Sequence, residues 1–517
     1  MDTPLSSELN EILKNSRSIS GPTTKYILTP TVLTDGELLR KERIGPQNEG
    51  KPNKVILLVG ETGTGKSSLV NAMINYIMGI RWEHKKWLEV IEISEDQTQS
   101  QTRAVTVYEV SAQSSPFHLT VIDTPGFGDT EGSDKDRRIA EALQQLFRPE
   151  DGIREIHAVC IVLNAADVRL HKRKRNILDE ILSLFGKDIN KHILLLLTHQ
   201  EKQTLPKRIG NFFMESFDKY VNNAHTCFKF DNCQSEYCHV NDRESYKASW
   251  DNGIENFRQF FDYMSKIPPI SLHMTEGVLR ARKQLDACVS NLQSRIELAD
   301  LKKRELEQTK KALDKLGEVQ KNFQYEVDKP YKELVPVDPS WWHLSKQATR
   351  CEHCQENCHY PGCWWVSEVS KCSVIDKKSK KCTVCTEKCE VKKHVKDDKK
   401  YVNETRRVTK TNEDLKKKYD EYGEKKSLMS RLEEDIQQTE VEKIRLVEEC
   451  YQCLEKLMET ALKSTSISSF IHLDFMIEKM KETGNQERVQ KLEDLKKRAT
   501  EENEELAEMM KNASLCY

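Results

Sequence analysis

The sequence predicts an α/β domain with a doubly wound, mostly parallel sheet, followed by a long α-helical region that carries a small cysteine-rich insert. Three observations predict this order. Short β-rich runs alternate with helical runs between residues 54 and 268, as in α/β folds. After residue 272, two charge-dense segments contain almost no Gly or Pro. Between these segments, eight of the 16 cysteines lie within residues 351–389.

The composition limits the possible functions. Of 517 residues, 32% are charged and 37% are hydrophobic, so much of the chain must be solvated helix. The 81 basic and 83 acidic side chains nearly cancel, which gives no basic field for nucleic acid. We find neither a signal peptide nor a transmembrane segment of about 18 apolar residues. We therefore expect a cytoplasmic protein with reduced cysteines.

The predicted domains follow from changes of composition along the chain. Residues 1–50 mix Ser, Thr, Pro and Gly without periodicity, as a flexible tail would. The α/β domain has six predicted strands, VILLVG, VTVYEV, FHLTVID, IHAVCIVLN, KHILLLLTH and CFKFD. The remaining boundaries are 51–268 for the α/β domain, 269–335 for a first helical arm, 336–399 for the insert, 400–465 for a second arm and 466–517 for a C-terminal helical tail.

The two arms show the sevenfold spacing of a coiled coil, which keeps one apolar stripe toward a partner helix. The stripes consist of Val278, Leu285, Leu292, Ala299, Leu306 and Leu313 in the first arm, and of Val408, Leu415, Tyr422, Met429 and Ile436 in the second. Because the arms flank the insert, we expect an antiparallel hairpin with the insert at its tip, entered through Tyr331–Trp342. Pairing between two chains is the alternative.

The segment GETGTGKS, Gly60–Ser67, matches the pattern G-x-x-x-x-G-K-[ST] between a strand and a helix. In such a loop the backbone N–H groups turn toward an anionic phosphate, and the helix N-terminus adds positive potential. Lys66 would neutralise β- and γ-phosphate oxygens, and Ser67 would bind Mg²⁺. The predicted nucleotide-binding residues of this segment are Gly60, Glu61, Thr62, Gly63, Thr64, Gly65, Lys66, Ser67 and Ser68.

A second motif, LTVIDTPGFGD, lies downstream at the spacing expected after a phosphate loop. Asp123 ends a predicted strand, where its carboxylate would hold Mg²⁺ through water, and the N–H of Gly126 would contact the γ-phosphate. The polar segment between the two motifs has the character of a mobile switch that offers a threonine to the metal. Thr102 is the candidate, and Thr98 is the alternative.

The motifs GETGTGKS, DTPG, LLLLTHQE and CFKFDN occur in the order and spacing of a G domain. Over residues 54–265 the sequence resembles the immunity-associated (GIMAP-type) GTPases, with septins as relatives. The resemblance implies guanine specificity, a nucleotide-switched dimer, bound GTP or GDP, and hydrolysis of GTP.

The resemblance also implies how the base is recognised. Base contacts would come from Thr198, His199 and Glu201, and from Asn232 in the tripeptide FDN. A carboxylate accepts hydrogen bonds from guanine N1–H and from the exocyclic amine, and adenine offers neither pairing. This loop would therefore decide between GTP and ATP. Glu201 stands where the family has Asp and is one methylene longer, which weakens this specificity without abolishing it.

Hydrolysis is expected to be slow in the monomer. Ras-like enzymes orient the attacking water with a Gln after the glycine of D-x-x-G, and Phe127 occupies that position here. An apolar side chain cannot orient water, so another group must do so. His199, Arg103, the basic run RLHKRKR and the partner subunit of a G-domain dimer are candidates.

The insert predicts zinc binding, because it contains two C-x-x-C pairs with flanking histidines. The candidate ligands are Cys351, Cys354, Cys358, His359, Cys363, Cys372, Cys382, Cys385, Cys389 and His394. They can serve two tetrahedral sites with ligands to spare, and thiolate-rich sites are closed to water, so we expect structural Zn²⁺. A redox or disulfide role is the alternative, against which the reducing compartment argues.

Two classes of function remain. The first is a guanine-nucleotide switch that forms a homodimer through its G domains or its coiled coil and moves a helical arm that binds protein partners. The second is a scaffold in which nucleotide and zinc are structural. An ATPase with the same core is a third possibility.

Overall fold

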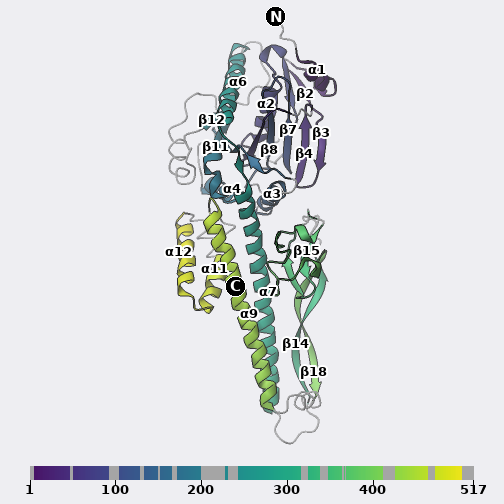
Figure 1. Ribbon diagram of the computed structural model, residues 1–517, viewed down its shortest axis with the longest axis vertical. Helices are drawn as coiled ribbons and strands as arrows, with labels where there is room; N and C mark the ends of the chain where they lie inside the picture. Colours follow the sequence, from purple (N-terminus) through teal and green to yellow (C-terminus); the bar gives the residue numbers. More distant parts are fainter. Residues whose placement is uncertain are drawn as a thin grey trace. The chain divides into compact units, whose positions relative to one another are not determined.

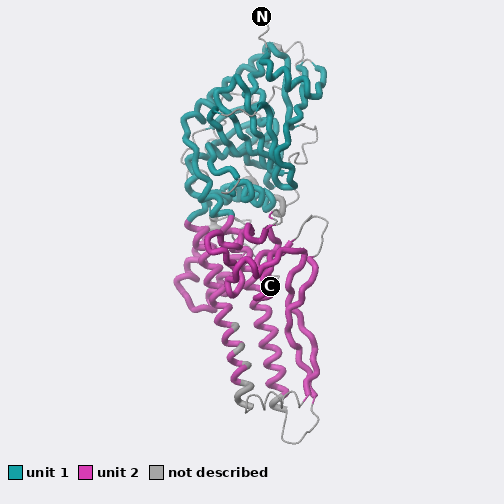
Figure 2. The backbone as a smooth tube through the Cα atoms, turned by 45° about the vertical axis from the view of Figure 1, so that its right-hand side comes forward, with its two compact units in different colours: residues 1–279, 460–468, 499–517 teal, residues 280–459, 469–498 magenta. Residues whose placement is uncertain are grey.

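The computed structural model describes residues 5–21, 23–46, 50–91, 104–128, 133–148, 152–165, 172–198, 227–230, 243–315, 324–337, 347–363, 366, 368–411, 425–463 and 472–502. The chain divides into two compact units (Figure 2). Unit 1 comprises residues 1–279, 460–468 and 499–517, and unit 2 comprises residues 280–459 and 469–498.

An eight-stranded sheet forms the centre of unit 1, in the order β12-β11-β10-β5-β8-β7-β4-β3. Its strands are β3 (Thr31–Asp35), β4 (Leu39–Ile44), β5 (Asn53–Val59), β7 (Val105–Val110), β8 (His118–Asp123), β10 (Ala158–Asn164), β11 (Ile193–Thr198) and β12 (Cys227–Lys229). All six predicted strands are present. Only the pairs β7–β8 and β3–β4 are antiparallel, so the predicted mostly parallel sheet is confirmed.

Helices lie on this sheet because its central strands are apolar on both faces (Figure 1). Ile56 and Leu58 of β5 belong to a core shared with helices α1, α2 and α6. Leu57 and Val59, which point to the opposite face, are also fully buried. The helices of unit 1 are α1 (Ser7–Lys14), α2 (Lys66–Ile77), α3 (Ser133–Leu146), α4 (Lys172–Ser183) and α6 (Arg243–Lys266), with α7 (His273–Lys315) beginning there and continuing into unit 2.

The described residues between 5 and 46 are not the flexible tail that the composition of residues 1–50 predicted. Leu9 and Leu13, one helical turn apart on α1, are buried in the core of unit 1. β4 pairs in parallel with β7 and extends the central sheet. A second, three-stranded sheet contains β1 (Arg17–Ile19), β2 (Thr24–Ile27) and β6 (Lys86–Glu89). The segment is ordered by strands far away in the sequence, which local composition does not reveal.

Unit 2 contains two long helices that lie side by side, α7 and α9 (Lys425–Thr460), one in each predicted arm (Figures 1 and 2). In the first arm, Leu285, Leu292 and Ala299 of the predicted stripe are buried. In the second arm the buried residues lie later in the helix, at Leu446, Val447, Cys450, Tyr451, Leu454 and Leu457. Leu415 and Tyr422 lie outside the described residues.

The helical prediction is wrong at the two ends nearest the insert. β14 (Gln324–Pro336) and β18 (Lys399–Thr411) form an antiparallel ribbon of 13 residue pairs there, and Val408 of the predicted stripe lies in β18. Pro330 and Pro336 were a signal for this difference, since proline interrupts a helix but is accepted in a two-stranded ribbon.

The insert does not lie at the tip of a helical hairpin as predicted. The ribbon leads the chain back along α7 and α9 (Figure 1), so the insert packs against the sides of these helices. Gln284 on α7 donates to the carbonyl oxygen of Ser373 at 3.4 Å, and Lys388 forms an ion pair with Glu449 on α9.

The insert itself is a small three-stranded antiparallel sheet in the order β16-β15-β17. Its strands are β15 (Ala348–Cys351), β16 (Glu356–His359) and β17 (His394–Asp397). The predicted C-terminal tail contains α11 (Leu473–Glu482) and α12 (Gln486–Glu502). The remaining short elements are η1 (Trp82–His84), β9 (Glu155–Ile156), η2 (Lys187–His192), β13 (Ile270–Ser271), η5 (Val369–Lys371) and η6 (Val391–Lys393).

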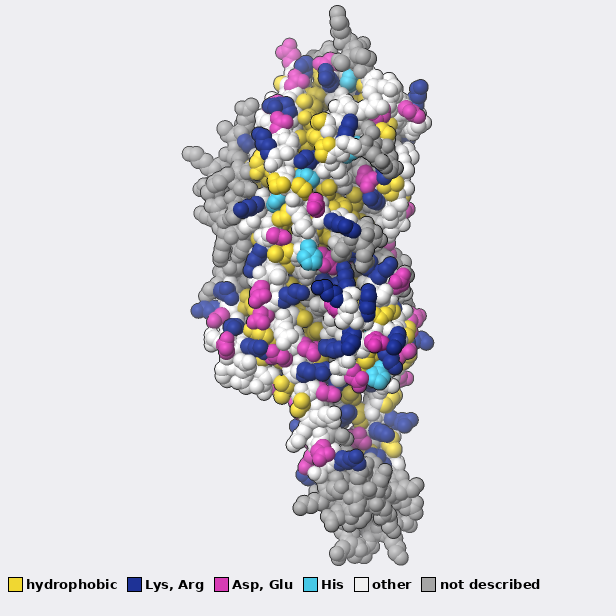
Figure 3. Space-filling model, viewed as in Figure 1, with side chains coloured by type: hydrophobic (Ala, Val, Ile, Leu, Met, Phe, Trp, Pro, Cys, Tyr) yellow, Lys and Arg dark blue, Asp and Glu magenta, His cyan; other side chains and the backbone are white. Residues whose placement is uncertain are grey.

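The surface agrees with the balanced composition. On the face shown in Figure 3, basic and acidic side chains are interspersed over both units. Within the described ranges, every helix is too short or too polar to span a bilayer.

Candidate functional site

The glycine-rich loop connects the end of β5 to the start of α2. Gly63 and Gly65 have φ angles of 81° and 82°, a left-handed conformation that glycine adopts without steric cost. Gly65 is the N-cap of α2 and has no side chain to accept from the first helical N–H groups. These groups have no partner within the helix itself, so the loop suits an anion.

Lys66 lies over this loop. Its side chain is only 7% exposed, and its Nζ donates hydrogen bonds to the carbonyl oxygens of Gly60 at 3.0 Å and Glu61 at 2.9 Å. The fold thus holds a positive charge at the point where the loop turns. Ser67 and Ser68 follow in the first turn of α2 and are half-buried.

Residues at the ends of two other strands of the sheet are hydrogen-bonded to the loop or to β5, which leads into it. Thr198, the last residue of β11, donates from its hydroxyl to the carbonyl oxygen of Thr64 at 2.6 Å. Thr124 follows β8, and its hydroxyl donates to the carbonyl oxygen of Leu58 at 2.8 Å. Thr124 is a site residue that the sequence analysis missed, although it is the Thr of the quoted DTPG motif.

The two predicted motifs meet in space. The N–H of Phe127 donates to the carbonyl oxygen of Gly60 at 3.1 Å. A Cβ atom at Gly126 would lie 2.6 Å from the amide nitrogen of Thr62, so only glycine fits there. Asp123, at the end of β8 and opposite Leu58 of β5 in register, is completely buried. The structure therefore brings the loop, Asp123 and Gly126 together.

The hydroxyl group of Thr62 is buried and has no hydrogen-bond partner among the described residues. Buried polar atoms are normally paired. A buried hydroxyl without a partner, in the same loop as the buried Lys66, fits a site shaped for a polar ligand.

The base-recognition and switch residues are only partly described. Thr198 is fully buried with its hydroxyl engaged, so it positions the segment that follows rather than presenting its own side chain. Phe127 is 1% exposed, which agrees with an inability to orient water. His199, Glu201, Asn232, Thr98, Thr102 and Arg103 lie outside the described residues.

A hydrogen bond that the sequence did not predict joins the second motif to α3. The N–H of Gly128 donates to Oδ1 of Asp136 on α3 at 3.2 Å. Gly128 has a φ of 69°, again in the left-handed region. The sequence held no motif that pointed to Asp136.

The insert gathers all ten predicted zinc ligands into three groups. The groups are Cys351, Cys354, Cys385 and Cys389; Cys358, Cys382, Cys385 and His394; and His359, Cys363 and Cys372, with the ligand atoms of each group within 4.8 Å of one another. The strands β15, β16 and β17 bring these residues together from positions up to 43 residues apart in the chain.

The distances within the groups match those around a tetrahedral zinc ion. With Zn–S bonds of about 2.3 Å, two sulfur ligands are about 3.8 Å apart. Sγ of Cys354 and Sγ of Cys389 are 3.7 Å apart, and Sγ of Cys385 lies 3.7 Å from Nε2 of His394. These separations are far longer than a disulfide bond of about 2.05 Å, and the described cysteines are free.

The surroundings also orient the ligands. The N–H groups of Cys354 and Cys385 donate to the sulfurs of Cys351 and Cys382, each at 3.4 Å, as in a C-x-x-C turn around a metal. Nδ1 of His394 lies 3.0 Å from the carbonyl oxygen of Glu390. A hydrogen bond there leaves Nε2 free for a metal, the usual arrangement of a metal-binding histidine.

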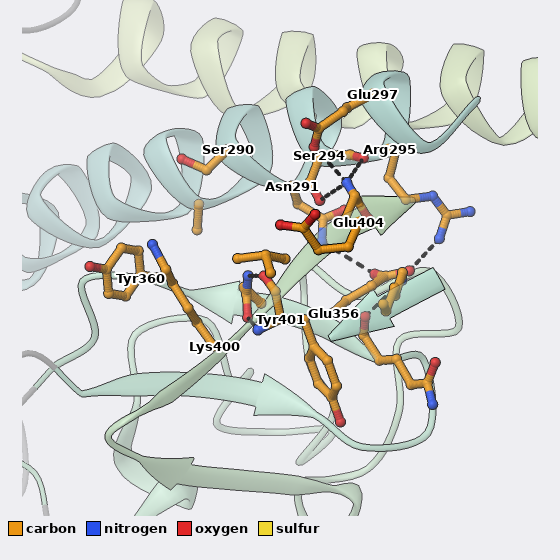
Figure 4. Close-up of a pocket in the computed structure, with 16 residues that line it drawn as sticks. Ser290, Asn291, Ser294, Arg295, Glu297, Glu356, Tyr360, Lys400, Tyr401 and Glu404 are labelled. Atoms are coloured by element: carbon orange, nitrogen blue, oxygen red, sulfur yellow. Dashed lines mark hydrogen bonds and ion pairs between the residues drawn. The ribbon is translucent and has the colours of Figure 1, made fainter. Parts of the chain in front are cut away.

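A separate cavity of about 420 Å³ lies in unit 2 between α7 and the ribbon (Figure 4). Asn403 crosses it and donates to the carbonyl oxygen of Ser294 at 2.9 Å and to Glu297 at 2.7 Å. Its charged lining residues are Arg295, Lys332 and Lys400, and Glu297, Glu356 and Glu404. The charges of these three basic and three acidic side chains cancel, so the cavity favours neither an anion nor a cation.

Comparison with known proteins identifies the domain in unit 1. Residues 54–267 match the model of the AIG1 family, which confirms the resemblance drawn from the motifs. Immune-associated nucleotide-binding protein 10 of Arabidopsis thaliana is 30% identical over 162 residues, which are 30% of this chain and 30% of that protein. Septin-1 of Drosophila melanogaster is 28% identical over 121 residues, 22% of this chain and 30% of that protein.

Solved structures include Toc33 from Arabidopsis thaliana in complex with GDP and Mg²⁺. That chain is 20% identical, with 38% of this chain and 83% of that chain covered, and the TM-score is 0.27. This chain covers 30%, 50% and 40% of the lengths of three of its curated relatives.

Proposed function

We propose, from the AIG1-family domain at residues 54–267, that this protein binds GTP with Mg²⁺ in the cytoplasm and acts as a nucleotide-dependent, dimerising switch. The observation that carries the proposal is the contact between its two motifs. The buried ammonium group of Lys66 and the DTPG segment both converge on Gly60. A triphosphate between them would meet a positive charge, backbone N–H donors and the buried hydroxyl of Thr62.

Each residue has a distinct role in this proposal. Lys66 neutralises the β- and γ-phosphates, while the N–H groups from Gly60 to Ser68 surround them. Ser67, Asp123 and Thr102 hold Mg²⁺, which neutralises phosphate charge. The N–H of Gly126 contacts the γ-phosphate, because Gly126 already packs against Thr62 of the loop.

Guanine recognition belongs to the segment after β11. The hydroxyl of Thr198 fixes the start of that segment to the phosphate loop. His199 and Glu201 then contact the base, with Asn232 after β12, and the Glu201 carboxylate accepts from guanine N1–H and the exocyclic amine. Hydrolysis is slow in the monomer, because Phe127 is buried and apolar.

Titration of the full chain with GTP and with ATP in Mg²⁺ tests nucleotide binding directly. We expect tighter binding of GTP by at least about tenfold, which corresponds to about 1.4 kcal/mol. Glu201→Ala should reduce this preference, because the base then loses its carboxylate partner. Absence of affinity for either triphosphate would overturn the proposal, and preference for ATP would favour the ATPase alternative.

Sizing of the full chain with GDP and with a nonhydrolysable GTP analogue tests the switch. A dimer that forms only with the analogue supports it. Identical profiles would instead favour a scaffold whose zinc module and long helices bind protein partners while nucleotide is structural.

We also propose that the insert binds structural Zn²⁺. The ten clustered ligands support this, since most are buried and thiolate-rich sites are closed to water. Zinc would cross-link a sheet of only three short strands, which offers little apolar core of its own. Metal analysis after gel filtration is the test, and a folded protein without metal would exclude zinc.

A further inference from the structure

We propose that the sulfur of Cys385 bridges two zinc ions, so that the insert holds a binuclear cluster beside a third, separate metal site. This inference rests on the proposed binding of zinc and adds the number and sharing of the ions.

The bridge follows first from the number of ligands. The first two groups each offer four ligand atoms at metal-binding separation, and Cys385 is the residue they share. The first group supplies Cys351, Cys354 and Cys389 in addition, and the second supplies Cys358, Cys382 and His394. A structural zinc ion takes four ligands. Seven residues can complete two such ions if one thiolate binds both, and a thiolate sulfur has lone pairs for two metals.

The position of Cys385 agrees with a shared role. Cys385 is completely buried. Its sulfur lies within 4.8 Å of the sulfur of Cys354 in the first group and of those of Cys358 and Cys382 in the second. Nε2 of His394 lies 3.7 Å from the same sulfur. No other residue of either group belongs to both.

Backbone donors surround the shared sulfur and its neighbours. The N–H of Cys389 donates to Sγ of Cys385 at 3.3 Å. The N–H groups of Val384 and Cys385 donate to Sγ of Cys382 at 3.3 and 3.4 Å. Such donors stabilise thiolate charge and hold the sulfur in one orientation, as a bridging ligand requires.

Electrostatics favours a bridge over two separate sites. The seven ligands include six thiolates and a neutral histidine, so two Zn²⁺ leave a formal charge of −2. An eighth, separate thiolate would add another negative charge to a buried site, which is costly. Lys332 donates to the carbonyl oxygen of Cys354 at 3.2 Å, and Lys388 donates to that of Thr383 at 2.5 Å. The ammonium group of Lys332 partly balances the remaining charge, whereas that of Lys388 already pairs with Glu449.

The third group is independent of the cluster. His359, Cys363 and Cys372 are buried and belong to neither of the other groups. Sγ of Cys363 lies 3.6 Å from Nδ1 of His359, near the separation of two ligands around one ion. The hydroxyl of Thr349 donates to Sγ of Cys372 at 3.4 Å. With three protein ligands, this site would take its fourth ligand from water, so we expect three metal ions in each chain.

Metal analysis and cadmium NMR of the full chain test the bridge. We expect three zinc ions per chain and, after exchange for ¹¹³Cd, scalar coupling between two of the three cadmium resonances through the sulfur of Cys385. Metal-loaded protein without cadmium–cadmium coupling would overturn the bridge but leave zinc binding intact. Folded protein without metal would overturn zinc binding itself.

A matched pair of variants locates the bridging sulfur. Cys385→Ser removes a ligand from both ions of the cluster, so a chelator should remove two zinc ions more readily than from the unmodified protein. Cys372→Ser should affect only one ion and leave the cadmium coupling unchanged. If Cys385→Ser weakens one ion only, Cys385 is not the bridge. If this variant does not fold, the coupling in the unmodified protein still decides the question.

Discussion

The hydroxyl group of Thr198 and the carbonyl oxygen of Thr64 are joined by a 2.6 Å hydrogen bond that ties the end of β11 to the phosphate loop. The two residues are 134 positions apart in the chain. A glycine-rich loop has few side chains to hold its shape, so hydrogen bonds from other strands of the sheet must do so. The same threonine begins the segment proposed to read the base, so one bond positions both ends of the nucleotide site.

Thr198→Val should therefore weaken both stability and nucleotide binding. Valine has nearly the same shape but leaves the buried carbonyl oxygen of Thr64 without this donor, at a cost of about 1–3 kcal/mol. Thermal unfolding and GTP titration measure the two effects. Thr198→Ser keeps the hydroxyl and should bind GTP more tightly than the valine variant. Equal affinities for Val and Ser would contradict the role of the bond.

Lys66→Ala should lower the affinity for GTP by at least about 10²-fold, because each charge-assisted hydrogen bond contributes about 1.5–3 kcal/mol. Lys51 is a matched control, since its Nζ also donates to backbone carbonyls, those of Ala112, Gln113 and Ser115. It lies outside the proposed site, so Lys51→Ala should leave GTP binding unchanged. Undiminished affinity in Lys66→Ala would refute the phosphate role of Lys66.

Gly126→Ala should weaken nucleotide binding, because the new methyl group would meet the backbone of Thr62 at 2.5–2.6 Å and force the two motifs apart. Gly277→Ala is the control. It lies in α7 with nothing within 4 Å of the added methyl group, and alanine should stabilise the helix by up to about 1 kcal/mol. The two variants are compared by GTP titration and by thermal unfolding. Normal binding by Gly126→Ala would show that this packing is dispensable.

Stability should depend on pH through His157. Burial, and then the positive charges of Lys54 and His192, lower the pKa of His157 from 6.5 to about 4. The folded protein therefore keeps this imidazole neutral, and its Nδ1 accepts from the N–H of Val55 at 3.2 Å. The unfolded chain binds the proton more readily, so this stability is complete above pH 6.5 and is lost as the pH falls toward 4.

The variant His157→Asn tests this dependence, because its amide oxygen can accept from Val55 but does not titrate. The difference in unfolding free energy between the unmodified protein and the variant should shrink as the pH falls from 7.5 to 5. A constant difference for His157→Asn would rule out the titration of His157 as its cause.

Arg295 on α7 should be essential for docking of the insert. It forms ion pairs with Glu356 of the insert and Glu442 of α9, and Glu356 is only 3% exposed. Arg295→Met leaves that buried carboxylate uncompensated, at a cost of about 3–5 kcal/mol. Arg258→Met removes exposed ion pairs with Glu255 and Asp262, which solvent screens, so it should change the melting temperature little. Similar melting temperatures for the two variants would contradict this difference.

The sequence by itself determined the features that depend on neighbouring residues. A run of apolar residues before a glycine-rich segment was enough to predict β5, the phosphate loop and α2. The spacing of Cys351 and Cys354, and of Cys382 and Cys385, was enough to predict that the cysteines of the insert gather in groups. In each case the chemistry lies within a few consecutive residues, so a motif can record it.

Only the tertiary structure decided which distant segments meet. From the sequence, residues 39–44 were predicted to belong to a flexible tail. In the structure they form β4, which pairs with β7 more than 60 positions away. The ends of the two arms form a ribbon because β14 and β18 pair with each other. Cys385 belongs to two groups of ligands because the folded insert places it between them. Such pairings are stabilised by contacts between residues far apart in sequence, and local periodicity does not record them.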